Sequence, residues 1–142
     1  MANNYTQFSA FLQVPADQLD LAQVIIDRET ERLYEDDDEG YCGVKADMER
    51  DGVWFHEEES GTPTHCEAIA RALVEELKIN EPFVCSWAYT CSKPRIDEFG
   101  GGAFLVRRGK PTIWCDAEQQ VRTVDYRRIN RHRRSANQQG GR

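Results

Sequence analysis

The fold of this 142-residue chain is decided by residues 42–56, CGVKADMERDGVWFH. Apolar and polar side chains alternate in the first half of this stretch, which is the period of a β-strand with one buried face. Asp51-Gly52 follows as a two-residue turn signal, because both residue types accept the backbone of a tight hairpin. Residues 53–56 continue as the returning strand. The stretch therefore predicts an antiparallel β-hairpin.

Two segments with helical periodicity flank the hairpin. Residues 16–34 place apolar side chains on one stripe, and Pro15 marks the start of this helix. A second helix is expected to open at Thr62, with Thr64 and Glu67 forming a capping box. Alternation and β-rich composition predict four further strands, at residues 5–14, 83–91, 99–106 and 112–115.

This order of elements predicts an α+β fold. We expect two helices packed on an antiparallel sheet, as in a ferredoxin-like β-α-β-β-α-β sandwich with one or two added C-terminal strands. The length suits a single domain, which we place at residues 1–120. Residues 121–142 are rich in arginine and poor in apolar side chains, which predicts a basic, disordered tail.

Charge is divided unequally along the chain. Residues 1–104 hold 8 basic and 22 acidic side chains, whereas residues 105–142 hold 10 basic and 3 acidic ones, within a net charge of −7. An acidic body can imitate nucleic acid and occupy a basic groove, because complementary potentials speed encounter and select partners. Within the acidic run at residues 35–39, we expect Asp36, Asp37 and Asp38 to contact such a partner.

The sequence also predicts a compartment. No stretch approaches the roughly 20 apolar residues that span a bilayer, and the start of the chain shows no leader pattern, so we expect a cytoplasmic protein without membrane contact. The five cysteines form an odd set with no C-x-x-C pair, which favours reduced thiols over disulfides or a zinc ribbon. No cofactor is expected.

Motifs that carry catalysis or bind metals are incomplete in this sequence. Aligning Gly40 with the sixth position of a calcium loop puts Ala46 at the twelfth, where a bidentate glutamate is required. His56 lacks a second histidine four residues later, so the metalloprotease signature fails. His65 and Cys66 point about 100° apart on a helix, and Cys66 falls on the apolar stripe. The sequence predicts no catalytic and no metal-ligating residue.

The most distinctive segment is residues 85–91, CSWAYTC, in which large and small side chains alternate. Trp87 and Tyr89 share one face of the expected strand, either as core or as an exposed aromatic platform for a partner or a base, and core is the commoner outcome. Residues 100–102 are all glycine, which suggests a bulge, a close backbone approach or room for these two aromatic rings. The intervening loop presents Lys93 and Arg95, as a contact site or as a solvated turn.

Residues 87–95, WAYTCSKPR, and residues 98–103, EFGGGA, carry a resemblance. This pair of motifs resembles a segment of small uncharacterised proteins of bacteriophages and other mobile elements. The resemblance implies a phage or plasmid origin and an accessory role, of which inhibition of host defence is one form. It implies no site residues.

The leading functional hypothesis is a non-enzymatic interaction protein that engages a host protein with a basic surface. The residues predicted to contact it are Asp36, Asp37, Asp38, Trp87, Tyr89, Lys93 and Arg95. The alternative is a nucleic-acid-binding module whose tail contacts phosphates through Arg122, Arg127, Arg128, Arg131, Arg133 and Arg134. A second alternative is a metal- or cysteine-dependent enzyme. The sequence predicts no oligomeric state.

Overall fold

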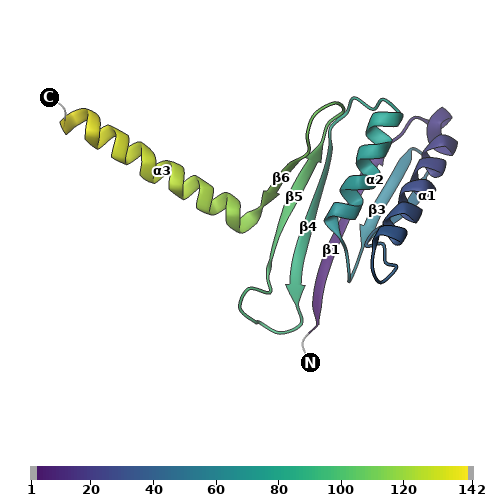
Figure 1. Cartoon of the computed structure of the whole chain (residues 1–142), viewed down its shortest axis with the longest axis horizontal. Coiled ribbons are helices and arrows are strands. Elements are labelled where there is room, and N and C mark those ends of the chain that lie inside the picture. The colour runs from purple at the N-terminus through teal and green to yellow at the C-terminus, as the bar shows by residue number, and fades with distance from the viewer. Residues whose placement is uncertain (1–2, 141–142) are drawn as a thin grey trace.

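The structure is a computed structural model that describes residues 3–140, with six strands and three helices in that part of the chain (Figure 1). In chain order the elements are β1 (Asn4–Gln13), a 3-10 turn (Ala16–Gln18), α1 (Leu19–Asp36), β2 (Lys45–Glu49), β3 (Gly52–Glu57), α2 (Pro63–Glu76), β4 (Phe83–Cys91), β5 (Gly100–Val106), β6 (Ile113–Asp116) and α3 (Ala117–Gly140).

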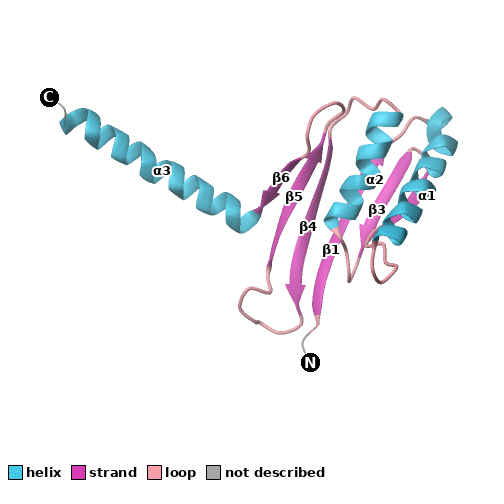
Figure 2. Ribbon diagram, in the orientation of Figure 1, coloured by secondary structure: helices cyan, strands magenta, loops and turns pink. Residues whose placement is uncertain are grey.

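The strands form one sheet in the order β2-β3-β1-β4-β5-β6, and each neighbouring pair is antiparallel. Helices α1 and α2 lie side by side on one face of this sheet (Figure 2). Arg28 of α1 joins the two helices, because its guanidinium donates to the Glu76 carboxylate at 2.8 Å. The opposite face carries no helix of the described residues.

The predicted hairpin is confirmed. Strands β2 and β3 pair with Met48 opposite Val53, but the turn lies at Arg50 and Asp51, one residue earlier than expected, because Gly52 already pairs with Glu49. Glycine is required at the start of β3, because a Cβ on Gly52 would lie 2.2 Å from the Leu12 carbonyl oxygen.

The core lies between the sheet and the two helices. Both predicted helical stripes are buried there, with Ile25 and Ile26 from α1 and Ile69 and Leu73 from α2. Three phenylalanines of the sheet fill the other side of this layer, Phe55, Phe83 and Phe104. The periodicity of the sequence therefore identifies the buried side of each helix correctly.

Two expectations about the architecture need correction. The α+β class and the helices on an antiparallel sheet are confirmed. Residues 3–140 form three helices where two were expected, however, and the order of their six-stranded sheet departs from the four-stranded template. The segment expected to be a disordered tail from residue 121 belongs to helix α3, and only residues 141–142 of it lie outside the described residues. Arginine, glutamine and alanine are good helix formers, so this segment is helical by propensity without an apolar stripe.

The predicted capping box is also wrong. Helix α2 begins at Pro63 after Thr62, and no side chain caps this end. The Glu67 carboxylate instead accepts a hydrogen bond from the Thr112 hydroxyl at 2.6 Å, which ties α2 to the segment before β6. Arg71 strengthens the same junction, because it donates to the Thr112 hydroxyl oxygen and to the Arg107 carbonyl, each at 2.7 Å.

Helices in residues 3–140 are too short or too polar to cross a lipid bilayer.

Candidate functional site

Two acidic runs meet at one end of the domain. The first run, residues 35–39, begins in the last turn of α1, and the second, residues 57–59, begins at the last residue of β3. Tyr41 links the two segments, because its hydroxyl donates a hydrogen bond to the Ser60 carbonyl. The Thr62 backbone N–H adds a bond of 2.8 Å to the Gly43 carbonyl. We call this surface the acidic end, and its eight members are Glu35, Asp36, Asp37, Asp38, Glu39, Glu57, Glu58 and Glu59.

The three predicted aspartates have different surroundings. The half-buried Asp37 carboxylate accepts the backbone N–H groups of Glu39 at 2.8 Å and Tyr41 at 3.2 Å, so it shapes its own loop. Asp36 lies 3.7 Å from Arg32 on the preceding turn of α1. Asp38 is exposed. Of the three, Asp38 is the residue best placed for contact.

Sequence reasoning missed the contribution of the second acidic run. Glu58 and Glu59 are exposed beside the first run, although about twenty positions separate the two along the chain. The signal was present as three consecutive glutamates after His56. Only the turn from β3 into α2 brings them to the end of α1.

Burial controls the titration of the groups beneath the acidic end. Partial burial lowers the pKa of His65, and the nearby Asp37 carboxylate opposes this effect. The hydrogen bond of this side chain requires the neutral ring, because Nδ1 of His65 accepts the Gly43 N–H at 3.0 Å. Burial, followed by repulsion from Glu57, raises the pKa of Tyr41 and keeps its hydroxyl protonated. Both side chains therefore act as neutral supports of the loop.

The predicted aromatic pair is split between core and surface. Trp87 is half-buried against Phe104 and Trp114, with ring centroids 6.5 and 5.9 Å away, whereas Tyr89 is 39% exposed. Both lie on the face that carries the helices, since Phe83 and Cys85 of the same face are buried. The Trp87 indole nitrogen is buried without a hydrogen-bond partner among the described residues. The two rings thus form the margin of the core.

The glycine run gives room to these rings. Gly102 pairs with Trp87 across the strands, and a Cβ at Gly102 would lie 2.6 Å from the Trp87 ring. Gly101 meets backbone instead, because its Cβ would lie 2.5 Å from the Trp87 carbonyl oxygen. Two of the three expected reasons for the glycines, room for a ring and close backbone approach, are therefore confirmed.

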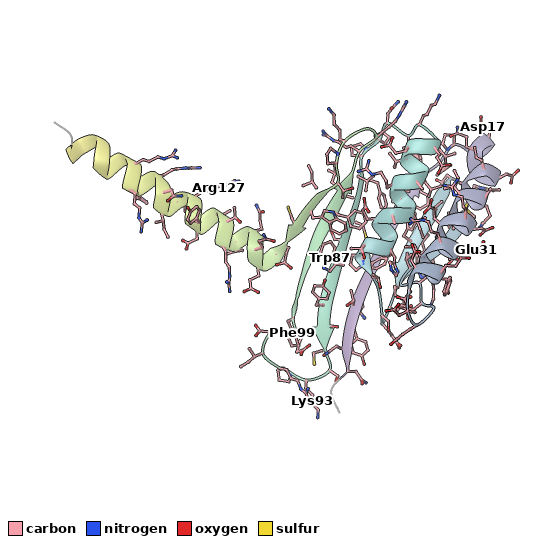
Figure 3. All side chains as sticks on the ribbon, viewed as in Figure 1. Asp17, Glu31, Trp87, Lys93, Phe99 and Arg127 are labelled. Carbon is pink, nitrogen blue, oxygen red and sulfur yellow. The ribbon has the colours of Figure 1, made fainter. Side chains whose placement is uncertain are left out.

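Lys93 and Arg95 lie in the exposed loop between β4 and β5 (Figure 3). Strands β3 and β4 both run antiparallel to β1, so they end at the same end of the sheet. The loop and the acidic end therefore share this end, with the start of β1 between them (Figure 1). Trp87 lies further along the sheet, away from Lys93.

The predicted phosphate-binding arginines all lie on α3, which leaves the β6 edge and projects away from the domain (Figure 1). Its main contacts are with β5 and β6. Arg122 forms an ion pair with Glu118 one turn earlier, and Arg127, Arg128, Arg131, Arg133 and Arg134 are exposed. At 100° per residue these arginines spread over about two thirds of the helix circumference. The helix is therefore basic, but its arginines are not gathered on one face.

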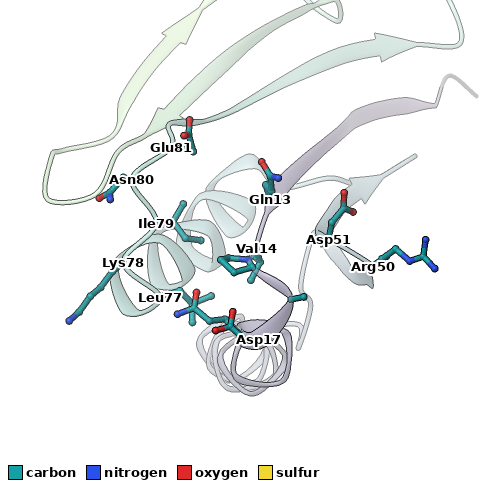
Figure 4. A pocket seen from close by; sticks show the side chains of 13 residues that line it. Gln13, Val14, Asp17, Arg50, Asp51, Leu77, Lys78, Ile79, Asn80 and Glu81 are labelled. Atoms are coloured by element: carbon teal, nitrogen blue, oxygen red, sulfur yellow. The ribbon is translucent and has the colours of Figure 1, made fainter.

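A hollow of about 750 Å³ lies at the opposite end of the sheet from the acidic end (Figure 4). It is bounded by the end of β1, the turn between β2 and β3, and the segment after α2. Its charged lining mixes Asp17, Asp51 and Glu81 with Arg50 and Lys78, and it contains neither cysteine nor histidine. This hollow therefore offers neither a thiol nor an imidazole, and its mixed charges do not favour a ligand of one sign.

The cysteines differ in their burial. Cys66 is fully buried against Cys85, and burial raises the pKa of its thiol well above the ordinary value, so the reactive thiolate is disfavoured. Within residues 3–140, histidine, cysteine and carboxylate side chains form no group of three able to hold a metal ion.

Comparison with known proteins gave no match: no family model, no curated protein and no solved structure is similar to this chain.

Proposed function

We propose that this chain is a non-enzymatic interaction protein that binds a basic surface of another protein through the acidic end. The observation that carries the proposal is the meeting of two acidic runs at one end of the domain, supported by the bonds of Tyr41 and Thr62. The resemblance of residues 87–95 and 98–103 to proteins of phages and mobile elements supports a host protein of the cytoplasm as the proposed partner. Inhibition of host defence or of nucleic-acid machinery is the role that follows.

The strength of such binding depends on the number and arrangement of the charges. A single exposed ion pair contributes only about 0.2–1 kcal/mol, so one aspartate cannot hold a partner. Exposed carboxylates from two runs act together on an approaching basic surface, and their field speeds encounter at low salt. Neutral His65 and Tyr41 beneath them leave this field uncompensated.

Lys93 and Arg95 supply the opposite charge at the same end of the sheet. A partner with a basic patch facing the acidic end and an acidic patch facing Lys93 and Arg95 would bind in one orientation only. Other orientations would bring like charges together, which is unfavourable. Exposed Tyr89 adds an aromatic contact on the helix side of β4. Trp87 supports this contact from below, since its ring lies 6.4 Å from that of Tyr89.

We also propose that the elements from β1 to β4 are a ferredoxin-like core to which β5, β6 and α3 have been added. In support, strands β4, β1, β3 and β2 are neighbours in that order, and α1 and α2 connect them on one face.

The proposal is tested by affinity capture from host lysate with matched variants. One variant removes three charges at the acidic end, Asp38→Asn, Glu58→Gln and Glu59→Gln. The control removes three exposed charges elsewhere, Asp17→Asn, Asp20→Asn and Glu81→Gln, and so has the same net charge. We expect a discrete protein that the wild type and the control retain and the first variant loses. Equal retention by both variants contradicts the proposal.

A second candidate is nucleic-acid binding through α3. The observation in its favour is the position of this helix, which projects from the β6 edge and so separates its arginines from the acidic end (Figure 1). Such binding should weaken steeply with salt, because each phosphate contact releases a counterion. A chain that ends at Asp116 should lose all binding to labelled DNA and RNA. An intact chain that binds neither at low salt removes this candidate.

A further inference from the structure

The sheet face that carries no helix has an unusual composition. Successive side chains of a strand point to opposite faces of the sheet. Phe8 and Leu12 of β1 and Phe83 and Cys85 of β4 point into the core, so the residues between them face away from α1 and α2. We call the other side of the five strands β3, β1, β4, β5 and β6 the open face. Its residues are Gly52, Trp54, His56, Tyr5, Gln7, Ser9, Phe11, Gln13, Val84, Ser86, Ala88, Thr90, Gly101, Ala103, Leu105, Ile113 and Cys115.

None of these residues carries a formal charge when His56 is neutral, in a chain of which 30% is charged. On the same side of the sheet, the edge strand β2 carries Lys45, Asp47 and Glu49, which bound the open face. A solvated face of an antiparallel sheet is usually polar and often charged. Here four large apolar side chains are exposed instead: Phe11 at 45%, Trp54 at 38%, Val84 at 53% and Ile113 at 57%. The open face therefore has the composition of a surface that another molecule covers.

The open face is also flat and ordered. Its middle is lined by small side chains, Ser86 and Ala88 on β4 and Gly101 and Ala103 on β5. The Trp54 indole is fixed by a bond of 2.8 Å to the Ser9 hydroxyl and by stacking on His56, with ring centroids 3.7 Å apart. His56 is fixed in turn by Asp47 at 2.6 Å. Little side-chain freedom would be lost when this face is covered.

We infer that the open face is where two copies of this chain pack, sheet against sheet. A neutral face offers no cations to phosphates and no anions to the basic partner proposed above, so both of those ligands fit other parts of the molecule. A second copy brings an equally flat and neutral face. Stacked sheets lie about 10 Å apart, and the small residues in the middle allow this approach.

The available area is sufficient for a stable dimer. The five strands of the open face, spaced ~4.8 Å apart with about seven residues each at ~3.3 Å, cover roughly 550 Å². Two such faces bury roughly 1,100 Å² together, which exceeds the roughly 1,000 Å² that a specific interface needs. The acidic end lies outside the open face, so a dimer presents two acidic ends and can bind a repeated partner with greater avidity.

A pair of matched valine variants tests this inference in the full chain. Val84 lies on the open face and is 53% exposed, whereas Val24 lies on α1 and is 61% exposed. Val84→Lys puts a charge into the proposed interface, and Val24→Lys puts the same charge elsewhere. By sedimentation equilibrium over a hundredfold concentration range, we expect dimers of the wild type and of Val24→Lys, and at least a tenfold weaker dimer of Val84→Lys.

Cysteine reactivity supplies a second measurement that does not depend on Val84. Cys115 is exposed on the open face, whereas Cys91 lies on the other face. Alkylation followed by mass spectrometry should show Cys115 of the wild type protected as concentration rises, with Cys91 unchanged. A wild type that stays monomeric overturns the inference, whether or not it carries nucleic acid or binds lipid vesicles. Equal dimerisation of the two lysine variants overturns it as well.

Discussion

At the scale of single residues, Gly102 and Trp87 depend on each other. The Trp87 ring covers Gly102, and a Cβ there would also lie 2.2 Å from the Cys115 carbonyl oxygen. Any side chain must therefore displace both the ring and strand β6. The ring in turn joins Phe104 to the more exposed Tyr89.

We therefore expect Gly102→Val to lower the free energy of unfolding by about 1–3 kcal/mol, as overpacking usually does. The matched control is Gly100→Ala, because a Cβ at Gly100 would make only an ordinary contact of 3.6 Å with Tyr89. Urea unfolding followed by circular dichroism measures both. Equal losses for the two variants would show that the Trp87 ring has no part in the effect.

His65 makes the loop beneath the acidic end sensitive to pH. Burial lowers its pKa in the fold, whereas the unfolded chain has the ordinary value of about 6.5. The stabilisation is therefore complete above about pH 6.5 and is lost as pH falls toward the lower pKa of the fold, since the unfolded chain takes up the proton first. Protonation also removes the acceptor of the Gly43 N–H.

The corresponding prediction concerns His65→Asn, which keeps an acceptor and does not titrate. Its free energy of unfolding should fall less than that of the wild type between pH 7 and pH 5, measured by urea unfolding at each pH. His56 and His132 are present in both proteins, so their contributions cancel. An identical pH dependence of the two proteins would contradict a role for His65.

Sequence reasoning reached part of the site at this scale. The acidic run and its exposure follow from composition. The role of Asp37 in shaping its loop could not be predicted, because it depends on hydrogen bonds from two backbone N–H groups that no sequence pattern indicates. The glycines could be assigned to ring space because Trp87 and Tyr89 alternate with small residues. The contribution of Glu58 and Glu59 could not be predicted, because it depends on where the chain turns after β3.

At the scale of elements, hydrophobic periodicity predicted the helices and strands that have a buried face. It failed for α3, which has none over residues 117–134. Helices α1 and α2 and the β2–β3 hairpin were predicted from apolar spacing, and each buries the expected face. This part of helix α3 has no buried stripe: Val121, Tyr126 and Ile129 are all exposed. A prediction based on amphipathic periodicity therefore takes such a segment for a disordered tail.

Helix α3 should accordingly be separable from the domain. We expect the chain ending at Asp116 to remain folded, because the helix packs mainly on β5 and β6 and its residues 117–134 contribute no buried core side chain. Its melting temperature should lie within a few degrees of the full chain. Differential scanning calorimetry of both proteins checks this. Loss of the cooperative transition would mean that α3 is part of the fold.

At the scale of the whole molecule, charge is sorted by position. The acidic end lies where β3 and α1 finish, the basic helix α3 leaves from the β6 edge, and a neutral open face lies between them on the far side of the sheet. Each surface suits a different class of contact, because electrostatic complementarity selects partners by sign. The sequence showed the division of charge along the chain, and the fold converts it into separate surfaces.

The central claim is that the acidic end binds a basic protein surface, and the affinity of the captured partner tests it most directly. Calorimetry with the purified partner should give a wild-type dissociation constant that rises steeply with salt. The variant lacking charge at Asp38, Glu58 and Glu59 should bind at least tenfold more weakly and with a flatter salt dependence, whereas the control lacking charge at Asp17, Asp20 and Glu81 should bind like the wild type. Equal affinity of the two variants at every salt concentration would contradict the account.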